Sequence, residues 1–297
     1  MNQLAVPDIS VAASAGATEA GRWHADLELQ FARSARGCRL ARNRHNGPLY
    51  VQKPFYPEGR DLAHVYLLHP PGGLVSGDRL DIRVEVQEGA AALVTTTGAG
   101  RVYRARRDGL LQSQNTTLRV AAGASLEWLP LENIAFPGAN GAMHTRVELA
   151  RGARFAAWEV TSLGLPARGE IFAGGQLRQR LEIFREGVPL LVESLHLVGD
   201  DILNARAGLQ GLPVNGLMVM GPFDNTFDDD VIECCRVLIA AHEPRCVAGI
   251  TLVGEILAVR ALGDCAFEVR GLLTELWELL RPILLGRSPC APRIWRT

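Results

Sequence analysis

The feature that most constrains the fold is a turn that recurs between strand-like segments. Four Gly-Ala or Gly-Val pairs, at Gly89-Ala90, Gly123-Ala124, Gly152-Ala153 and Gly187-Val188, follow one another at intervals of 34, 29 and 35 residues. β-type sequence flanks each pair. Regular strands with recurring turns predict a mostly β fold of stacked short strands and hairpins, similar to a solenoid, in which each unit buries its face against the next.

The pattern changes after about residue 198, where helical periodicity replaces alternation. Thr226 and the acidic residues 228–230 form a helix start, with a capping hydroxyl and charges that complement the helix dipole. Apolar residues then recur at i, i+3, i+4 and i+7, which places the adjacent Cys234 and Cys235 in a core. A last helix starts at about Cys265 and ends near Gly286. We therefore expect two helices in the C-terminal third, with strands at 247–252 and 256–259 between them.

Composition indicates the kind of protein and its surroundings. The net charge of −1 and the 47% hydrophobic content fit a soluble globular protein and give no basic footprint for nucleic acid. The chain contains no run of 18 apolar residues, so we predict no membrane-spanning helix. The six cysteines are irregularly spaced, which favours reduced thiols and a cytoplasmic location. Residues 1–20 are predicted to form a disordered tail, and 21–297 a single β-rich domain.

One stiff loop carries several reactive residue types. His69 is followed by two prolines and two glycines, and a second bend holds Ser76 and Asp78 before the next strand. Loops of this kind on rigid scaffolds often carry function. The plain alternative is a tight turn that these polar residues cap. A Ser-based hydrolase is a further alternative, but it needs a base within reach of the hydroxyl and an oxyanion hole, which one short loop seldom supplies.

Other catalytic signatures are missing from the chain. There is no GxxxxGK[ST] phosphate loop, no complete GxGxxG before a helix and no GxSxG elbow. The seven histidines show no HxH or HxxxH spacing. We therefore predict a protein that is not an enzyme and that binds no cofactor tightly.

The stiff loop also resembles a known family signature. The segment 69–80, HPPGGLVSGDRL, is similar to the HPPGG[IL]VGGD motif of the UreD/UreH family of urease accessory proteins, with Ser76 in place of a glycine. Thr97 and Arg101 stand where a second family block tends to have Pro and Lys. The resemblance spans residues 23–297, and its further blocks follow in the family's order at 53–58, 95–104, 126–136, 164–170 and 280–295.

The resemblance implies a urease maturation chaperone. Such a protein binds the urease apoprotein and a UreF-type accessory protein, which recruits a UreG-type GTPase, and nickel in transit reaches the urease active site through an internal passage. A passage needs individually weak oxygen ligands. The candidates for a nickel path are the carboxylates Asp78, Glu127, Glu132 and Glu170, with Thr95 and Thr97 as neutral neighbours.

Two alternatives stay open beside this reading. Each candidate carboxylate also fits a surface or hydrogen-bonded structural role, such as a solvated strand edge or a capped turn. The chain could then be a purely structural scaffold, with the metal carried elsewhere in the complex. For docking, the last helix has a wide apolar face, and Leu276, Trp277 and Leu280 are predicted to contact the UreF-type partner.

Overall fold

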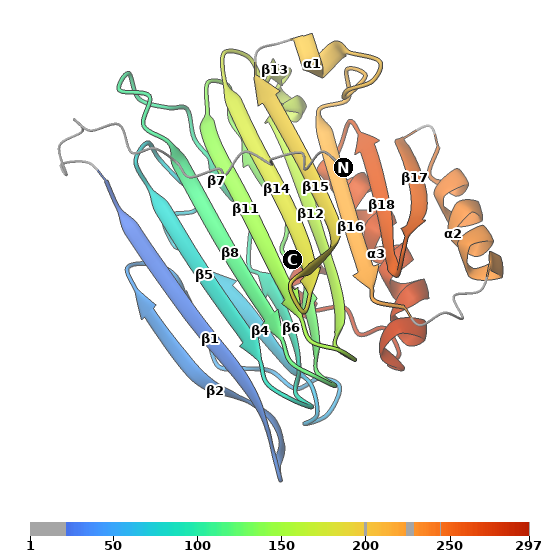
Figure 1. Cartoon of the computed structure of the whole chain (residues 1–297). Coiled ribbons are helices and arrows are strands. Elements are labelled where there is room, and N and C mark those ends of the chain that lie inside the picture. The colour runs from blue at the N-terminus through green and yellow to red at the C-terminus, as the bar shows by residue number, and fades with distance from the viewer. Residues whose placement is uncertain (1–21, 199–200, 224–228, 244, 297) are drawn as a thin grey trace, which may run out of the picture.

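A computed structural model describes residues 22–198, 201–223, 229–243 and 245–296 of the chain (Figure 1). Strands make up 51% of it and helices 16%, which confirms the predicted mostly β class. The predicted tail at 1–20 and the predicted cap Thr226 lie outside the described residues. Figure 1 shows two sheets lying face to face, with the helices of the C-terminal part beside the second sheet.

The first sheet contains seven strands in the order β15-β14-β11-β8-β5-β1-β2. Its strands are β1 (His24–Ser34), β2 (Gly37–Asn46), β5 (Arg79–Val86), β8 (Gln112–Val120), β11 (Asn140–Leu149), β14 (Gln176–Arg185) and β15 (Val188–Val198). The strands from β1 through β5, β8 and β11 to β14 pair in parallel, whereas β2 and β15 run antiparallel at the two edges.

The second sheet contains eleven strands, eight of them in the order β17-β18-β16-β12-β9-β6-β4-β3. Its main strands are β3 (Tyr50–Val51), β4 (Ala63–Leu68), β6 (Ala91–Thr96), β9 (Ser125–Trp128), β12 (Arg154–Leu165), β16 (Val214–Gly221), β17 (Cys246–Val253) and β18 (Ile256–Gly263). Three short strands pair at its side, namely β7 (Gly100–Val102), β10 (Asn133–Ala135) and β13 (Glu170–Ile171). The strands predicted at 247–252 and 256–259 are thus confirmed as β17 and β18.

The recurring turns carry the chain from the first sheet to the second. Gly89, Gly123 and Gly152 stand between β5 and β6, β8 and β9, and β11 and β12, and their φ angles of 65°, 64° and 74° suit only glycine well. The following alanines are buried, and the turns are joined along the stack: the amide of Ser125 donates to the carbonyl of Ala90 at 3.0 Å. One strand in the first sheet, the turn and one strand in the second sheet make up one coil of the solenoid. Because each coil repeats this turn, equivalent strands of successive coils lie parallel and in register, as the solenoid prediction requires.

The fourth predicted turn behaves differently. Gly187-Val188 closes an antiparallel hairpin between β14 and β15 within the first sheet. Glu186 and Gly187 both have positive φ, 50° and 80°, which is the geometry of a tight two-residue hairpin turn. The coil therefore ends at this point, because the chain turns back beside itself instead of crossing to the other sheet.

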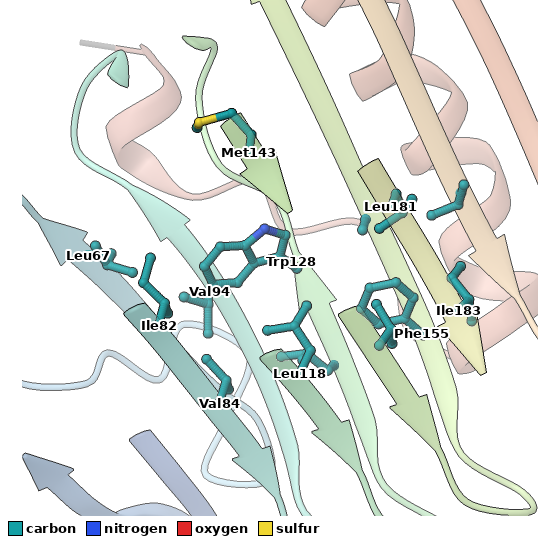
Figure 2. Packing of buried hydrophobic residues seen from close by; sticks show 14 of the residues in the cluster. Leu67, Ile82, Val84, Val94, Leu118, Trp128, Met143, Phe155, Leu181 and Ile183 are labelled. Carbon is teal, nitrogen blue, oxygen red and sulfur yellow. The ribbon is translucent and has the colours of Figure 1, made fainter. Parts of the chain in front are cut away.

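The apolar core has two parts. One lies between the two sheets, where alternate side chains of facing strands interdigitate, as Figure 2 shows for Ile82, Leu118 and Phe155. The other lies between the second sheet and the helices α2 (Asp229–Ala241) and α3 (Ala266–Leu285). These are the two expected C-terminal helices. The described residues add the four-residue α1 (Asp201–Asn204) and two short 3-10 helices, Pro166–Arg168 and Arg293–Arg296. Cys235 lies in this second core as predicted, whereas Cys234 is exposed.

The three residues predicted to contact a partner lie inside this second core. Leu276, Trp277 and Leu280 are all 0% exposed, because the apolar face of α3 packs on β12 and β16 of the chain's own sheet. A partner that reaches α3 would instead meet the exposed Phe267 and Ile283.

Candidate functional site

Two of the family-like loops meet at one end of the space between the sheets. The amide of Leu74, in the HPPGG loop, donates to the carbonyl of Arg101 at 2.7 Å, and the amide of Tyr103 donates back to Leu74 at 3.0 Å. A Cβ added at Gly73 would lie 2.6 Å from the Arg101 carbonyl oxygen, so no larger residue fits without movement. These backbone contacts hold the loop rigidly.

A hollow of about 210 Å³ opens beside these loops and runs between the sheets. His69, Thr97 and Arg101 line it at the end nearest the loops. Burial lowers the pKa of His69, and the nearby charge of Asp78 opposes this shift only in part, so the imidazole is neutral at pH 7. This end of the hollow therefore carries one positive charge, on Arg101, beside neutral polar groups.

Four polar side chains that point between the sheets lie at the inner end of the hollow and are here called the polar neck: Thr145, Glu159, Thr161 and Gln179. All but Thr161 line the hollow itself. The Thr145 hydroxyl donates to Glu159 Oε1 at 2.7 Å, and Gln179 Nε2 donates to Thr161 Oγ1 at 2.8 Å. The side-chain oxygen of Gln179 is buried and has no hydrogen-bond partner among the described residues. Such an orphaned acceptor is unusual in a protein interior and marks a place where a donor or a cation would be stabilised.

A second hollow, of about 500 Å³, begins on the other side of the polar neck. Glu159 and Gln179 line both hollows, so these two side chains stand where the two spaces meet. The second hollow continues outward between β14 and β15 on one side and β16, β17 and β18 on the other. Glu193 and Arg260 line its outer part.

Glu159 is the ionisable group at this junction. Protein surrounds it on all sides, yet its side chain keeps some accessible surface because it faces the hollows. Burial raises the pKa of Glu159, and the hydrogen bond from Thr145 opposes that shift. A carboxylate, an amide oxygen and two hydroxyls are oxygen donors that hold a borderline divalent cation weakly, whereas imidazole or thiolate would hold it firmly.

The predicted candidates Asp78 and Ser76 serve the loop itself. The Asp78 carboxylate accepts a hydrogen bond of 2.9 Å from the amide of Val75, three residues earlier. Ser76 is 0% exposed, and its Oγ accepts from the amide of Arg106 at 2.7 Å. No hydrogen bond joins Ser76 to His69 in the described part of the chain, so the geometry gives the hydrolase alternative no support.

Glu127 lies on the opposite face of the second sheet, in an ionic group here called the Arg281 cluster: Glu58, His64, Glu127, Trp277 and Arg281. Arg281 contacts Glu127 at 2.9 Å and Glu58 at 2.8 Å, and Trp277 donates to Glu127 at 2.7 Å. Burial alone would raise the pKa of Glu58, but hydrogen bonds from His64 and Arg281 outweigh it and hold the pKa at about 2. Glu58 is thus ionised, and both carboxylates are already paired with Arg281.

The remaining candidates are separate from these groups. Glu132 lies 3.4 Å from Arg270, the exposed Glu170 lies 3.2 Å from Arg168, and the Thr95 hydroxyl accepts from Trp295 at 2.9 Å. Of the residues predicted for the nickel path and its neutral neighbours, Thr97 is the one that lines the first hollow. None of the four predicted carboxylates lines either hollow, and the described residues contain no group of three or more His, Cys, Asp or Glu side chains that could hold a metal ion.

The sequence interpretation missed Glu159 and Gln179. A signal for both exists in the alternation of their strands. Phe155 and Ala157 face inward on β12, and Glu159 and Thr161 continue the same parity, which places polar side chains where the pattern demands apolar ones. Polar residues at inward-facing strand positions are the pattern that would have identified the polar neck.

The fold and the site together define a class of protein: a two-sheet β-solenoid in which a polar neck with a hollow on each side interrupts the apolar core between the sheets. A family model described as UreD urease accessory protein matches residues 24–296. A urease accessory protein UreD from Marinomonas sp. (strain MWYL1) is 49% identical over 94% of this chain and 91% of its own length. One from Alkalilimnicola ehrlichii is 44% identical over 98% and 97%, and one from Pseudomonas fluorescens (strain Pf-5) is 43% identical over 93% and 95%.

The chain therefore belongs to the UreD family of urease accessory proteins. This membership assigns it a role in urease maturation. Among the helices of the described residues, none is long and apolar enough to cross a membrane.

Proposed function

We propose that this chain is a urease maturation chaperone that passes nickel through its interior. The observation that carries the proposal is the position of Glu159 and Gln179 between two hollows, with an unused oxygen acceptor on Gln179. Nickel is the cargo here, and a transit site must bind it weakly enough to release it. A single carboxylate with amide and hydroxyl neighbours meets this requirement better than the paired carboxylates of the Arg281 cluster do.

Partner binding is a second component of the proposal. We infer that the chain binds the urease apoprotein and a UreF-type protein, with a UreG-type GTPase recruited through the latter. The helices offer a docking place for the UreF-type partner, since Val237 of α2 and Phe267 of α3 are 64% and 70% exposed. The free cysteines support the cytoplasmic location expected from the sequence.

The test is a Glu159→Gln variant made together with the urease subunits and the other accessory proteins. This change removes the charge and keeps the shape. We expect the variant to co-purify with its partners as the unaltered chain does, while the urease produced contains several-fold less nickel. Glu170→Gln is the matched control, because it makes the same change on an exposed carboxylate outside both hollows.

The scaffold alternative predicts a different result. If the chain only holds the complex together, nickel content follows the amount of complex recovered, whichever residue is changed. Unchanged urease nickel in Glu159→Gln, with normal complex formation, would exclude Glu159 from the nickel path.

A further inference from the structure

The strand β2, at one edge of the first sheet, lies within a strongly basic part of the chain. Residues 29–57 contain five arginines, one lysine and no acidic residue, although the net charge of the whole chain is −1. Four exposed arginines on β2 and in the turn before it are here called the basic edge: Arg36, Arg39, Arg42 and Arg44. Figure 1 shows β2 at the opposite end of the molecule from the helices. A concentration of one charge on such a surface attracts groups of the opposite charge.

Most of the charge on the basic edge is unpaired within the chain. Arg42 contacts Glu28 on β1 at 2.7 Å, and this pair is open to solvent, with side chains that are 43% and 37% exposed. The side chains of Arg36, Arg39 and Arg44 form no ion pair or hydrogen bond with any described residue. Arg42 and Arg44 lie opposite polar residues of β1, so both project from the solvent-facing side of the sheet. Carboxylates of another molecule can therefore reach these guanidinium groups without breaking a buried contact.

The backbone of β2 is free along the same stretch. From Arg42 to Asn46 the strand pairs with β1 alone, and no other part of the described chain bonds to its backbone. The beginning of the edge is covered, because the amide of Cys38 donates to the carbonyl of Arg60 at 2.8 Å. Alternate amides and carbonyls of residues 42–46 are thus available to an added strand.

Protection against aggregation does not explain the arginines by itself. Charged side chains on an edge strand discourage pairing with a second copy of the same chain. The other two long edge strands have few of them: apart from a histidine, β15 carries one charged residue, Glu193, and β17 carries none. Because this chain does not generally place charges on its edges, the arginines of β2 require a separate reason.

We propose that β2 is the docking edge for an extended acidic segment of a partner protein, which joins the first sheet as an additional strand. Residues 42–46 supply the backbone hydrogen bonds, and the basic edge selects carboxylates at alternate positions of the added strand. Guanidinium groups suit this role because they bind carboxylates through two parallel hydrogen bonds. A nucleic acid offers phosphates to the arginines but has no main chain that continues a sheet, so an acidic peptide fits this edge better. The inference goes beyond the proposed function and needs no part of the nickel route.

The test uses a fluorescent synthetic peptide of about ten residues in which Glu alternates with Thr. Its binding to the purified full chain is measured by fluorescence anisotropy, without nickel. The double variant Arg42→Gln, Arg44→Gln should bind the peptide about tenfold more weakly, because two cross-strand charge pairs are lost. The matched control is Arg119→Gln, Arg178→Gln, since these arginines lie on the same face of the sheet, on β8 and β14, which have a strand on each side. The control should change the dissociation constant by less than about twofold.

Hydrogen–deuterium exchange of the unaltered chain separates strand addition from simple charge attraction. Pairing with the peptide should slow the exchange of amides in residues 42–46, which no described residue outside β1 now binds, and leave β8 unchanged. This measurement needs no variant, so it decides the point even if an arginine change weakens the fold. Thermal unfolding shows whether both double variants remain folded.

Four outcomes would overturn the proposal. The alternating peptide fails to bind the full chain, or the two double variants weaken its binding equally. Binding that leaves exchange at residues 42–46 unchanged would show a charged surface without strand addition. Tighter binding of a single-stranded oligothymidine than of the peptide would show that the basic edge serves nucleic acid instead.

Discussion

Two glutamates on neighbouring strands of one sheet have opposite surroundings. Glu127 on β9 points outward to α3, where Arg281 and Trp277 satisfy both of its oxygens. Glu159 on β12 points inward, where one threonine hydroxyl bonds it and two hollows meet. A buried guanidinium already pairs with the first carboxylate, whereas burial raises the pKa of the second.

The comparison shows that burial alone does not identify a carboxylate that can handle a cation. A glutamate whose lone pairs are already used by arginine binds a passing ion only if that ion pair is broken, and this leaves a buried guanidinium unpaired. A glutamate with unused acceptors beside a hollow requires no such break. The Arg281 cluster is therefore structural, and the polar neck is the place where a cation can be exchanged.

The largest expected effect concerns the Arg281 cluster. Replacing Arg281 by Met should lower the free energy of unfolding by about 3–5 kcal/mol, because Glu58 and Glu127 lose a buried partner. Urea denaturation measures this loss. Arg119→Met is the control, since Arg119 pairs with Glu148 on the surface and such a pair is worth about 0–1 kcal/mol. Equal losses of unfolding free energy in the two variants would show that the buried ion pairs of the cluster stabilise the fold no more than a surface pair does.

A smaller expected effect concerns how pH changes the stability that each region contributes, since the Arg281 cluster and the polar neck should respond with opposite signs. The pKa of Glu58 lies at about 2 when folded and near 4.5 when unfolded, so its stabilisation is present above pH 4.5 and is lost as the pH falls toward 2. The stability difference between the unaltered chain and Glu58→Gln should therefore shrink by roughly 2–3 kcal/mol over that range.

Glu159 should give the opposite sign. Its folded pKa is raised, so the unaltered chain gains stability as the pH falls through the folded pKa toward the unfolded value near 4.5. Glu159→Gln should lack this gain, which makes it more stable than the unaltered chain at neutral pH and similar to it in acid. Unfolding curves at several pH values test both variants. A Glu159→Gln curve parallel to that of Glu58→Gln would contradict the contrast between the two regions.

The fold was predictable where its determinants are local. The turns at Gly89, Gly123 and Gly152 indicate the solenoid in the sequence, because each needs a positive φ and a small buried residue next to it. Gly187 looks the same in sequence, yet it closes a hairpin, because the two-residue turn that it forms with Glu186 depends on which strand lies beside it. That information is not local.

The site was less predictable for a related reason. The loop at 69–80 attracted attention through its prolines, its glycines and its family resemblance, and it does lie at the first hollow. Glu127 and Glu159 both occupy β-strands but lie on opposite faces of the second sheet. The helix α3 packs on the face of Glu127, and the first sheet lies opposite the face of Glu159. The prediction for Leu276 and Trp277 met the same difficulty. The sequence of an apolar helix face is the same whether the helix packs on its own sheet or on a partner.

The most direct test of the contrast is to locate the cation itself. Crystals of the full chain soaked in nickel chloride can be measured at the nickel absorption edge, where anomalous scattering marks the metal. The account predicts an anomalous peak within ligand distance of Glu159 and Gln179, and none at Glu127. A peak in the Arg281 cluster, or nickel only on surface histidines with the polar neck empty, would contradict it.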